Sequence, residues 1–285
     1  MTASITAPLA KGYSLVELMI SLALGLVISA SIIQVMVGNS GTERLNRALA
    51  SSQENGRYIV ARLRQDLLMA GMYDALSVNL DRSVDITEEE LFVRSNPIIL
   101  PGDFASRAAL GSTQGADGAA DKLVISLQHT SDCRGYSLGY LPNQEFYVVN
   151  EYFLDGDTLK CRGFDGRVLR GQRAAVGHNN HAAYTIADDV QQLQISYGIT
   201  ASNSAIPERF IDAGQLAAAR LSGSSVVAVR IALVVKGDTE LSLNSLPSFK
   251  LLNENSYTPQ QQGLYKQFEL TVTLRNVKNY TRSNA

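Results

Sequence analysis

The longest apolar run of the chain lies close to its amino terminus. From Leu18 to Val37, twenty residues follow one another without a charged side chain. A helix rises about 1.5 Å per residue, so this run would span roughly 30 Å, the thickness of the hydrocarbon core of a bilayer. It is longer than the roughly 7–15 residues of a signal-peptide core, and it continues past Ser29-Ala30-Ser31, where a signal peptidase would cut. The pattern therefore favours a retained membrane helix.

A helical pattern with one apolar face continues beyond this run. Apolar or small residues recur every three or four positions, at Leu45, Leu49, Ser52, Gly56, Ile59, Leu63, Leu67 and Ala70. Charged residues lie mainly off that face, and Gly71 offers a helix stop. We therefore predict one helix from about Ser14 to Ala70, with its second half packed under a globular head.

Short segments of the second half of the sequence alternate between apolar and polar residues, as half-buried strands do. The predicted strands cover residues 123–128, 146–154, 158–163, 192–199, 226–235 and 268–274. Asp155-Gly156-Asp157 is expected to be a hairpin turn, and the segment 226–235, apolar on nearly both faces, a central strand. Because no long helix separates these strands, antiparallel pairing is favoured. The predicted fold class is α+β, with a long N-terminal helix packed against an antiparallel β-sheet head.

Two long segments outside the strands are predicted to be loops. The first, Ser77–Asp121, holds the acidic triplet Glu88-Glu89-Glu90. The second, Thr200–Ser225, is expected to contain a short helix at Ala213–Leu221.

Composition excludes several functional classes. Hydrophobic residues make up 45 % of the 285 residues, enough for a folded core. The balance of 25 basic and 27 acidic residues gives a net charge of −2, unlike the basic surface of a nucleic-acid-binding protein. Two cysteines and three histidines offer few metal ligands, and no P-loop motif is present. No cofactor and no nucleic-acid partner is expected.

A carboxylate stands at the very edge of the apolar run. Ionisable residues in membrane segments are costly and usually functional, so Glu17 needs a partner. Cleavage after Gly12 would create an amine on Tyr13, four residues before Glu17. That amine, on the same chain or on a neighbour, is the natural counter-ion of the carboxylate.

The segment Lys11–Gly25, Lys-Gly-Tyr-Ser-Leu-Val-Glu-Leu-Met-Ile-Ser-Leu-Ala-Leu-Gly, resembles a type IV prepilin leader followed by the start of a pilin helix. The resemblance implies cleavage after Gly12 by a prepilin peptidase and N-methylation of Tyr13. It also implies that Glu17 pairs with the amine of a neighbouring subunit during filament assembly. The sequence departs from the family in having Tyr13 where phenylalanine is usual, and in lacking a helix-kinking proline.

The head resembles the PilW-type minor pilins. The similar segments are residues 152–159, 186–198, 226–233 and 274–276. With the leader, the resemblance implies four regions of a pilin-like chain: a leader peptide (1–12), a transmembrane half-helix (13–37), an amphipathic half-helix (38–75) and a periplasmic β-rich head (76–285).

The resemblance implies a non-enzymatic minor pilin that contributes to initiation and tip-proximal assembly of a type IV pilus. The implied partners are other minor pilins, the major pilin, the prepilin peptidase, the inner-membrane assembly platform and membrane lipid. The implied location is the bacterial inner membrane, followed by incorporation into the pilus at the cell surface. Two alternatives stay open: a minor pseudopilin of a type II secretion system, and a signal-anchored periplasmic enzyme or binding module.

The two cysteines, Cys133 and Cys161, are expected to form a disulfide, because a periplasmic head would lie in an oxidising compartment. Closing this loop would stabilise the head by roughly 3–4 kcal/mol on chain-entropy estimates. Two free, buried thiols are the alternative.

Three further patterns are weak candidates for chemistry. Gly135-Tyr136-Ser137-Leu138-Gly139 matches the nucleophile elbow of α/β-hydrolases, but Pro142 disfavours the helix that should follow. A pair of histidines, His178 and His181, has no third metal ligand in register. The aspartates Asp155, Asp157 and Asp165 suggest a calcium loop but lack the twelve-residue pattern.

Overall fold

The computed structural model describes residues 12–179, 182–202, 204–238, 245–252 and 256–277. The chain divides into two compact units, Met1–Asn46 and Arg47–Ala285. Of the predicted leader, residues 1–11 lie outside the described residues, as does His181. One helix, α1 (Leu15–Met69), contributes to both units.

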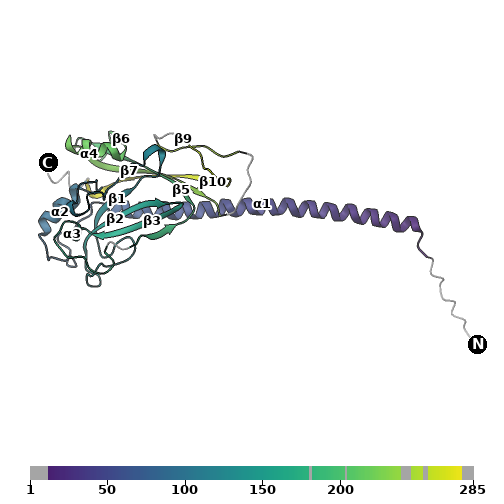
Figure 1. Cartoon of the computed structure of the whole chain (residues 1–285), viewed down its shortest axis with the longest axis horizontal. Coiled ribbons are helices and arrows are strands. Elements are labelled where there is room, and N and C mark those ends of the chain that lie inside the picture. Colours follow the sequence, from purple (N-terminus) through teal and green to yellow (C-terminus); the bar gives the residue numbers. More distant parts are fainter. Residues whose placement is uncertain (1–11, 180–181, 203, 239–244, 253–255, 278–285) are drawn as a thin grey trace, which may run out of the picture. The chain divides into compact units, whose positions relative to one another are not determined.

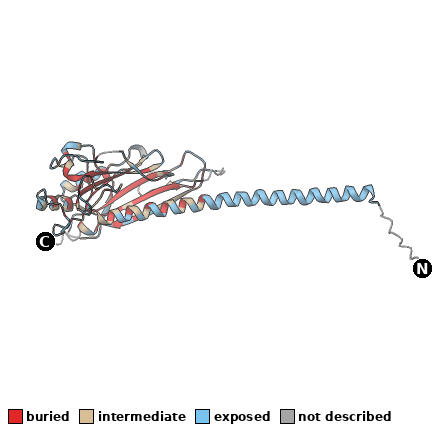
Figure 2. Ribbon diagram, turned by 90° about the horizontal axis from the view of Figure 1, so that it is seen from below, coloured by how far each residue is buried: buried red, intermediate tan, exposed pale blue. Residues whose placement is uncertain are grey.

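The first unit consists of the N-terminal part of α1. All described residues from Gly12 to Arg47 are exposed, including the apolar run (Figure 2). By length and composition alone, α1 is apolar enough to cross a membrane. The predicted membrane helix is therefore present as a helix, and its apolar side chains are not covered by protein.

In the second unit, hereafter the head, one face of α1 becomes buried. The buried residues of the helix are Ala48, Ser52, Gly56, Ile59, Leu63 and Leu67. The predicted apolar face is thus confirmed from position 52 onward, whereas Leu45 is 37 % exposed and lies before the first buried residue. The helix ends at Met69, and Gly71 takes a left-handed φ of 71° while its N–H bonds the carbonyl of Ser126 at 2.8 Å.

The strands of the head form two four-stranded antiparallel sheets (Figure 1). The first contains β1 (Leu123–His129), β2 (Phe146–Asp155), β3 (Thr158–Asp165) and β4 (Tyr184–Ala187), in that order. The second has the order β10 (Tyr265–Thr273), β7 (Ser225–Lys236), β5 (Val190–Thr200) and β6 (Arg209–Ile211). A two-stranded sheet pairs β8 (Phe249–Lys250) with β9 (Ser256–Tyr257).

The α+β prediction of a long helix and antiparallel sheets is confirmed, with two sheets in place of one. The predicted hairpin is β2–β3, and the predicted central strand is β7. Residues of α1 and of both sheets share one apolar cluster, which includes Ile59, Phe146 and Ile231. The chain passes from the first sheet to the second at Asp188-Asp189, between β4 and β5. Asp189 has a φ of 62°, and β5 pairs with β7 of the second sheet rather than with β4.

The segment Ser77–Asp121, predicted to be a loop, contains the helix α2 (Ile86–Ser95). Asp85 caps α2 by accepting hydrogen bonds from the N–H groups of Thr87 and Glu88. Two 3₁₀ turns follow, η1 (Ala105–Arg107) and η2 (Ala116–Gly118). The loop prediction was therefore wrong for α2, whose acidic first turn favours a helix start.

The remaining helices are short. The helix α3 (Gly166–Leu169) follows β3 directly, and α4 (Ala213–Leu221) lies where a short helix was predicted. Each begins with an aspartate cap: Asp165 for α3 and Asp212 for α4.

Candidate assembly site

The helix α1 begins with a reciprocal cap made by Ser14 and Glu17. The backbone N–H of Ser14 donates to Oε2 of Glu17 at 3.1 Å, and the N–H of Glu17 donates to Oγ of Ser14 at 3.3 Å. This capping box satisfies backbone donors that a helix start otherwise leaves unpaired. It holds the carboxylate at the helix end, next to Gly12 and Tyr13.

Glu17 is the one charged residue between Gly12 and Thr42. The side chain of Tyr13, four residues earlier, is 87 % exposed. Hydroxyls in this part of α1 donate to carbonyls one turn back, as Ser21 does to Glu17 at 2.7 Å and Ser31 does to Val27 at 2.9 Å. The first unit therefore presents an apolar surface with a single carboxylate at its beginning.

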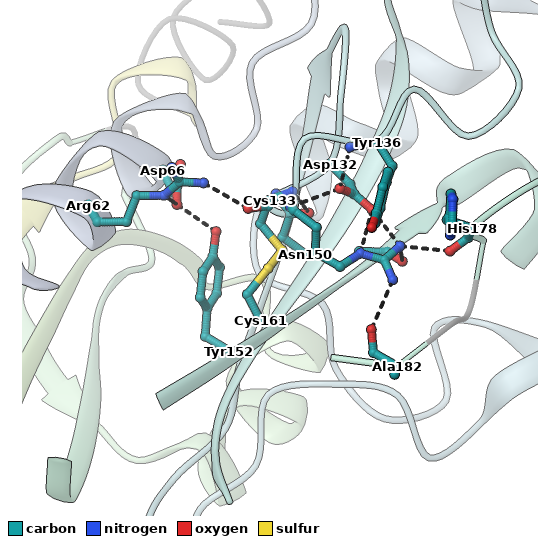
Figure 3. Close-up of a disulfide and its surroundings, with 12 residues drawn as sticks. Arg62, Asp66, Asp132, Cys133, Tyr136, Asn150, Tyr152, Cys161, His178 and Ala182 are labelled. Carbon is teal, nitrogen blue, oxygen red and sulfur yellow. Dashed lines mark hydrogen bonds and ion pairs between the residues drawn. A yellow bond between two sulfur atoms is a disulfide. The ribbon is translucent and has the colours of Figure 1, made fainter. Parts of the chain in front are cut away.

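A disulfide lies in the head beside α1 (Figure 3). Cys133, on the loop between β1 and β2, is joined to Cys161 on β3, with 6.4 Å between their Cα atoms. Asn150 on β2 accepts a hydrogen bond from the N–H of Cys133 at 3.0 Å. The covalent bond therefore fixes the 130–137 loop against the first sheet.

The same loop is linked to α1 (Figure 3). Arg62 donates to the carbonyl of Cys133 at 3.0 Å and to Asp66 at 3.1 Å. The hydroxyl of Tyr152, on β2, donates to Asp66 at 2.6 Å. Burial raises the pKa of Tyr152, and the adjacent Asp66 carboxylate raises it further, so the phenol stays protonated and remains a donor.

Arg134 connects the disulfide loop to the segment before β4. Its guanidinium forms an ion pair with Asp132 at 2.6 Å, and it donates to the carbonyls of Gly163, His178 and Ala182. Both charged side chains are buried, which a fully hydrogen-bonded pair tolerates. The disulfide and this pair together hold three segments of the head.

A cleft of ≈ 420 Å³ lies between this loop and α1. Its lining includes Arg62, Gln65 and Asp66 of the helix, together with His129 and Tyr184. The lining is mixed in charge and mostly polar, and the ion pairs above already occupy its arginines.

A second buried ion pair fastens α2 to α3, and sequence reasoning missed it. Arg167 donates to the two carboxylate oxygens of Glu89 at 2.7 and 2.8 Å, and both side chains are fully buried. Arg167 also pairs with Asp81, and the hydroxyl of Tyr73 donates to Glu89 at 2.8 Å. Burial and the Glu89 carboxylate raise the pKa of Tyr73. The cap residue Asp85 was the sequence signal that could have placed Glu89 on a helix.

The predicted calcium ligands do not come together. Asp155 is the last residue of β2 and pairs with Thr158, whereas Asp165 is the last residue of β3 and pairs with Val148. The two aspartates therefore lie at opposite ends of the β2–β3 pair. Asp155 forms an ion pair with Lys160, and Asp165 caps α3 while accepting from the hydroxyl of Tyr140. Within the described ranges, no group of three or more acidic, histidine or cysteine side chains is arranged to hold a metal ion.

The hydrolase motif does not form a nucleophile elbow. Its glycines, Gly135 and Gly139, take left-handed φ values of 86° and 84° in the loop between β1 and β2. Strand β1 ends at His129, well before Ser137, and β2 is the next element after it. His178 stacks on the ring of Tyr136 with centroids 4.0 Å apart.

Residues 145–276 match the family model of the type IV pilus-assembly protein W, PilW. The head is PilW-like. The match runs from the start of β2 to just beyond β10, so it contains Cys161 but excludes Cys133 and all of α1. The PilW-like region therefore does not overlap the leader-like segment Lys11–Gly25, and two separate parts of the chain resemble type IV pilus proteins.

Among solved structures, the chain is similar to a type IV-like pilin from Thermus thermophilus. The TM-score is 0.41 at 12 % sequence identity, and the likeness covers 81 % of this chain and 98 % of the other. No curated protein matches the sequence.

Proposed function

We propose that this PilW-like protein is a minor pilin that contributes to initiation and tip-proximal assembly of a type IV pilus. The observation that carries the proposal is the combination of a PilW-like head with a helix whose N-terminal part, up to Thr42, is apolar except for one charge, Glu17, near its start. The family match favours a pilus over the alternative of a type II secretion filament. It also supports a structural role rather than catalysis.

The proposed maturation begins with cleavage after Gly12 by a prepilin peptidase, and Tyr13 then carries an N-methylated amine. The N–H of Ser14 belongs to the Tyr13–Ser14 peptide bond, so this cleavage leaves the capping box with Glu17 intact. The mature subunit therefore keeps its carboxylate hydrogen-bonded at the helix start while a new cation appears beside it. This arrangement reduces the cost of holding Glu17 in a membrane before assembly.

During assembly, the Glu17 carboxylate forms an ion pair with the positively charged amine of an adjacent subunit. In a medium of low dielectric constant, an isolated carboxylate is strongly unfavourable and an ion pair is much less so. The pairing therefore selects neighbours whose amino termini lie at the level of Glu17. A subunit with no neighbour above it would leave the carboxylate unpaired, so Glu17 argues against the outermost tip position.

The proposed location is the bacterial inner membrane, with α1 crossing once, the head in the periplasm, and later incorporation into the pilus at the cell surface. The proposed partners are other minor pilins, the major pilin, the assembly platform and membrane lipid. A periplasmic location also accounts for the disulfide between Cys133 and Cys161, which an oxidising compartment preserves.

The substitution Glu17→Ala tests the proposal. The variant is expected to fold and insert in the membrane, because Glu17 is exposed and belongs to the first unit, but to lose co-purification with partner pilins. Glu54→Ala is the matched control, since Glu54 is an exposed glutamate of the same helix. Unchanged co-purification of the Glu17 variant would contradict the proposed assembly contact.

A further inference from the structure

The cleft of ≈ 420 Å³ beside the disulfide is bounded by three parts of the head. Its base is the face of the first sheet that carries Leu127 and Asn150, and Tyr184 begins the edge strand β4 of the same sheet. One side is formed by α1, and the other by the loop from His129 to Gly135. The volume falls within the range of small-molecule sites, about 300–1,000 Å³.

A buried amide at the base of the cleft has an unused donor. Asn150 is 3 % exposed, and its Oδ1 accepts a hydrogen bond from the N–H of Cys133 (Figure 3). That contact fixes the orientation of the carboxamide, so its Nδ2 group is the one left over. Among the residues that the structure describes, none accepts a hydrogen bond from this nitrogen. Because buried polar groups are almost always hydrogen-bonded, the nitrogen requires a partner from outside the chain.

The charged side chains that line the cleft neutralise one another. Arg62 forms an ion pair with Asp66, and Arg134 forms one with Asp132, so the two arginines and two aspartates leave no net charge. An anion entering the cleft would meet both aspartates, and a cation would meet both arginines. Either ion would have to displace an existing partner, which is costly for a charge that is already buried and paired. The cleft therefore fits a neutral ligand better than an ion.

The edge of the cleft carries an exposed aromatic ring. Tyr184 is 62 % exposed, and within the described ranges its hydroxyl has no hydrogen-bond partner. Gln65 of α1, also exposed, adds a carboxamide that both donates and accepts. An aromatic face beside such amides matches a pyranose sugar. The C–H bonds of the sugar stack on the negative face of the ring, and its hydroxyls donate to and accept from the amides.

We propose that this cleft binds a neutral saccharide of one or two pyranose rings. In the bound state, the ring of Tyr184 stacks on a sugar face, the Nδ2 group of Asn150 donates to a sugar oxygen, and Gln65 bonds hydroxyls on the side of α1. This binding activity goes beyond the proposed role in assembly and does not depend on it. Saccharides with acetamido groups and saccharides without them share this chemistry, and the test separates the two sources.

The test measures sugar binding by the full chain, purified in a detergent whose head group is not a sugar, with isothermal titration calorimetry and saturation-transfer difference NMR. The probes are N,N′-diacetylchitobiose, which carries acetamido groups, and lactose and maltose, which do not. We expect at least one probe to bind with a Kd of about 1 mM or tighter. Absence of binding by all three would overturn the inference, as would tighter binding of the anionic glucose 6-phosphate than of every neutral probe.

Substitutions at Tyr184 locate the bound sugar. Tyr184→Ala removes an exposed ring and is expected to weaken binding about tenfold, whereas Tyr184→Phe keeps the stacking surface and most of the affinity. Tyr58→Ala is the matched control, because Tyr58 is an exposed tyrosine of the head that does not line the cleft. Undiminished affinity of Tyr184→Ala, or an equal loss in Tyr58→Ala, would show that the sugar binds elsewhere.

A second variant, Asn150→Asp, keeps an oxygen to accept from Cys133 but removes the free donor, and it is also expected to weaken binding about tenfold. An unchanged urea midpoint shows that such a loss is not caused by unfolding, and an affinity equal to that of the unsubstituted chain would contradict the assigned donor. Failure to bind sugar leaves the proposed function intact, because that function is tested separately by co-purification of the Glu17 variant.

Discussion

The apolar side chains of the first unit are exposed, whereas those of the head are largely buried. Leu18 and Val37, in the first unit, are 58 % and 68 % exposed, whereas Leu63 on the same helix is 1 % exposed within the head. The head covers its own apolar surface with two sheets. The first unit leaves its surface to be covered by something outside the chain, as expected of a segment that works inside a membrane or a bundle of neighbouring helices.

The comparison implies that substitutions in the two units have separable effects. Changes near Glu17 should alter processing and assembly without altering the stability of the head. Changes in the buried networks of the head should alter its stability without preventing insertion of the helix.

The largest effect is expected from Gly12→Glu, which places a charged side chain at the proposed cleavage site. The chain should keep all 285 residues and fail to join other pilins, while the urea denaturation midpoint of its head stays unchanged. Intact mass and co-purification measure the first two results. Gly25→Ala is the control, because Gly25 is exposed like Gly12 but lies within α1, away from the proposed cleavage site, and has room for a methyl group. Normal cleavage of the Gly12 variant would contradict the proposed cleavage site.

The head should be most sensitive to Arg167→Met. This substitution leaves Glu89 buried without its counter-ion, which costs about 3–5 kcal/mol of unfolding free energy. Urea denaturation of the full chain in detergent, followed by near-UV circular dichroism of the tyrosines, measures the loss. The neighbouring Arg170 pairs with the exposed Glu88, so Arg170→Met should cost less than about 1 kcal/mol. Equal losses in the two variants would show that burial of the ion pair is unimportant.

Removing the disulfide should weaken the head slightly less. The double variant Cys133→Ser with Cys161→Ser is expected to lose roughly 3–4 kcal/mol, because its unfolded chain regains the freedom of the open loop. Reduction of the unsubstituted protein should produce the same shift of the urea midpoint. Coincident midpoints before and after reduction would contradict a stabilising role of this bond.

The smallest effect is expected from Tyr152→Phe, which removes one hydrogen bond between β2 and α1. Hydrogen bonds to charged groups contribute about 1.5–3 kcal/mol, and the partner here is the half-buried carboxylate of Asp66. Tyr58→Phe removes an exposed hydroxyl from the same helix and should change stability by less than about 0.5 kcal/mol. The same urea experiment distinguishes them, and equal midpoints for both variants would remove Tyr152 from the account of helix docking.

Local patterns predicted the elements that repeat a simple period. The buried face of α1, the β2–β3 hairpin and the central strand β7 follow from the spacing of apolar residues, and Gly71 does end the helix region. These features depend on neighbours in sequence, and a single chain records them directly.

The features that sequence reasoning missed depend on partners far along the chain. Glu89 was placed in a predicted loop as part of an acidic triplet, and only Arg167, 78 residues later, makes its burial favourable. Likewise, the turn at Asp188-Asp189 resembles the hairpin turn at Asp155, yet the strand after it joins the other sheet. Neither outcome is set by local periodicity.

In the candidate site too, some features could be predicted from the sequence and others required the structure. Gly12, Tyr13 and Glu17 stand out in the sequence, whereas the Ser14–Glu17 capping box needed the geometry of the helix start. The aspartates 155, 157 and 165 resembled a metal loop by residue type alone, although the strand predicted at 158–163 already stood between Asp157 and Asp165, as β3 does in the structure.

The most direct test of the proposed function is the amino terminus of the protein extracted from membranes of its native host, determined by intact mass and N-terminal sequencing. We expect the chain to start at N-methyl-Tyr13, which would establish prepilin processing and give Glu17 its counter-ion. A start at Ile32 would mean removal of an ordinary signal peptide, and it would contradict the proposal that this protein is a pilin.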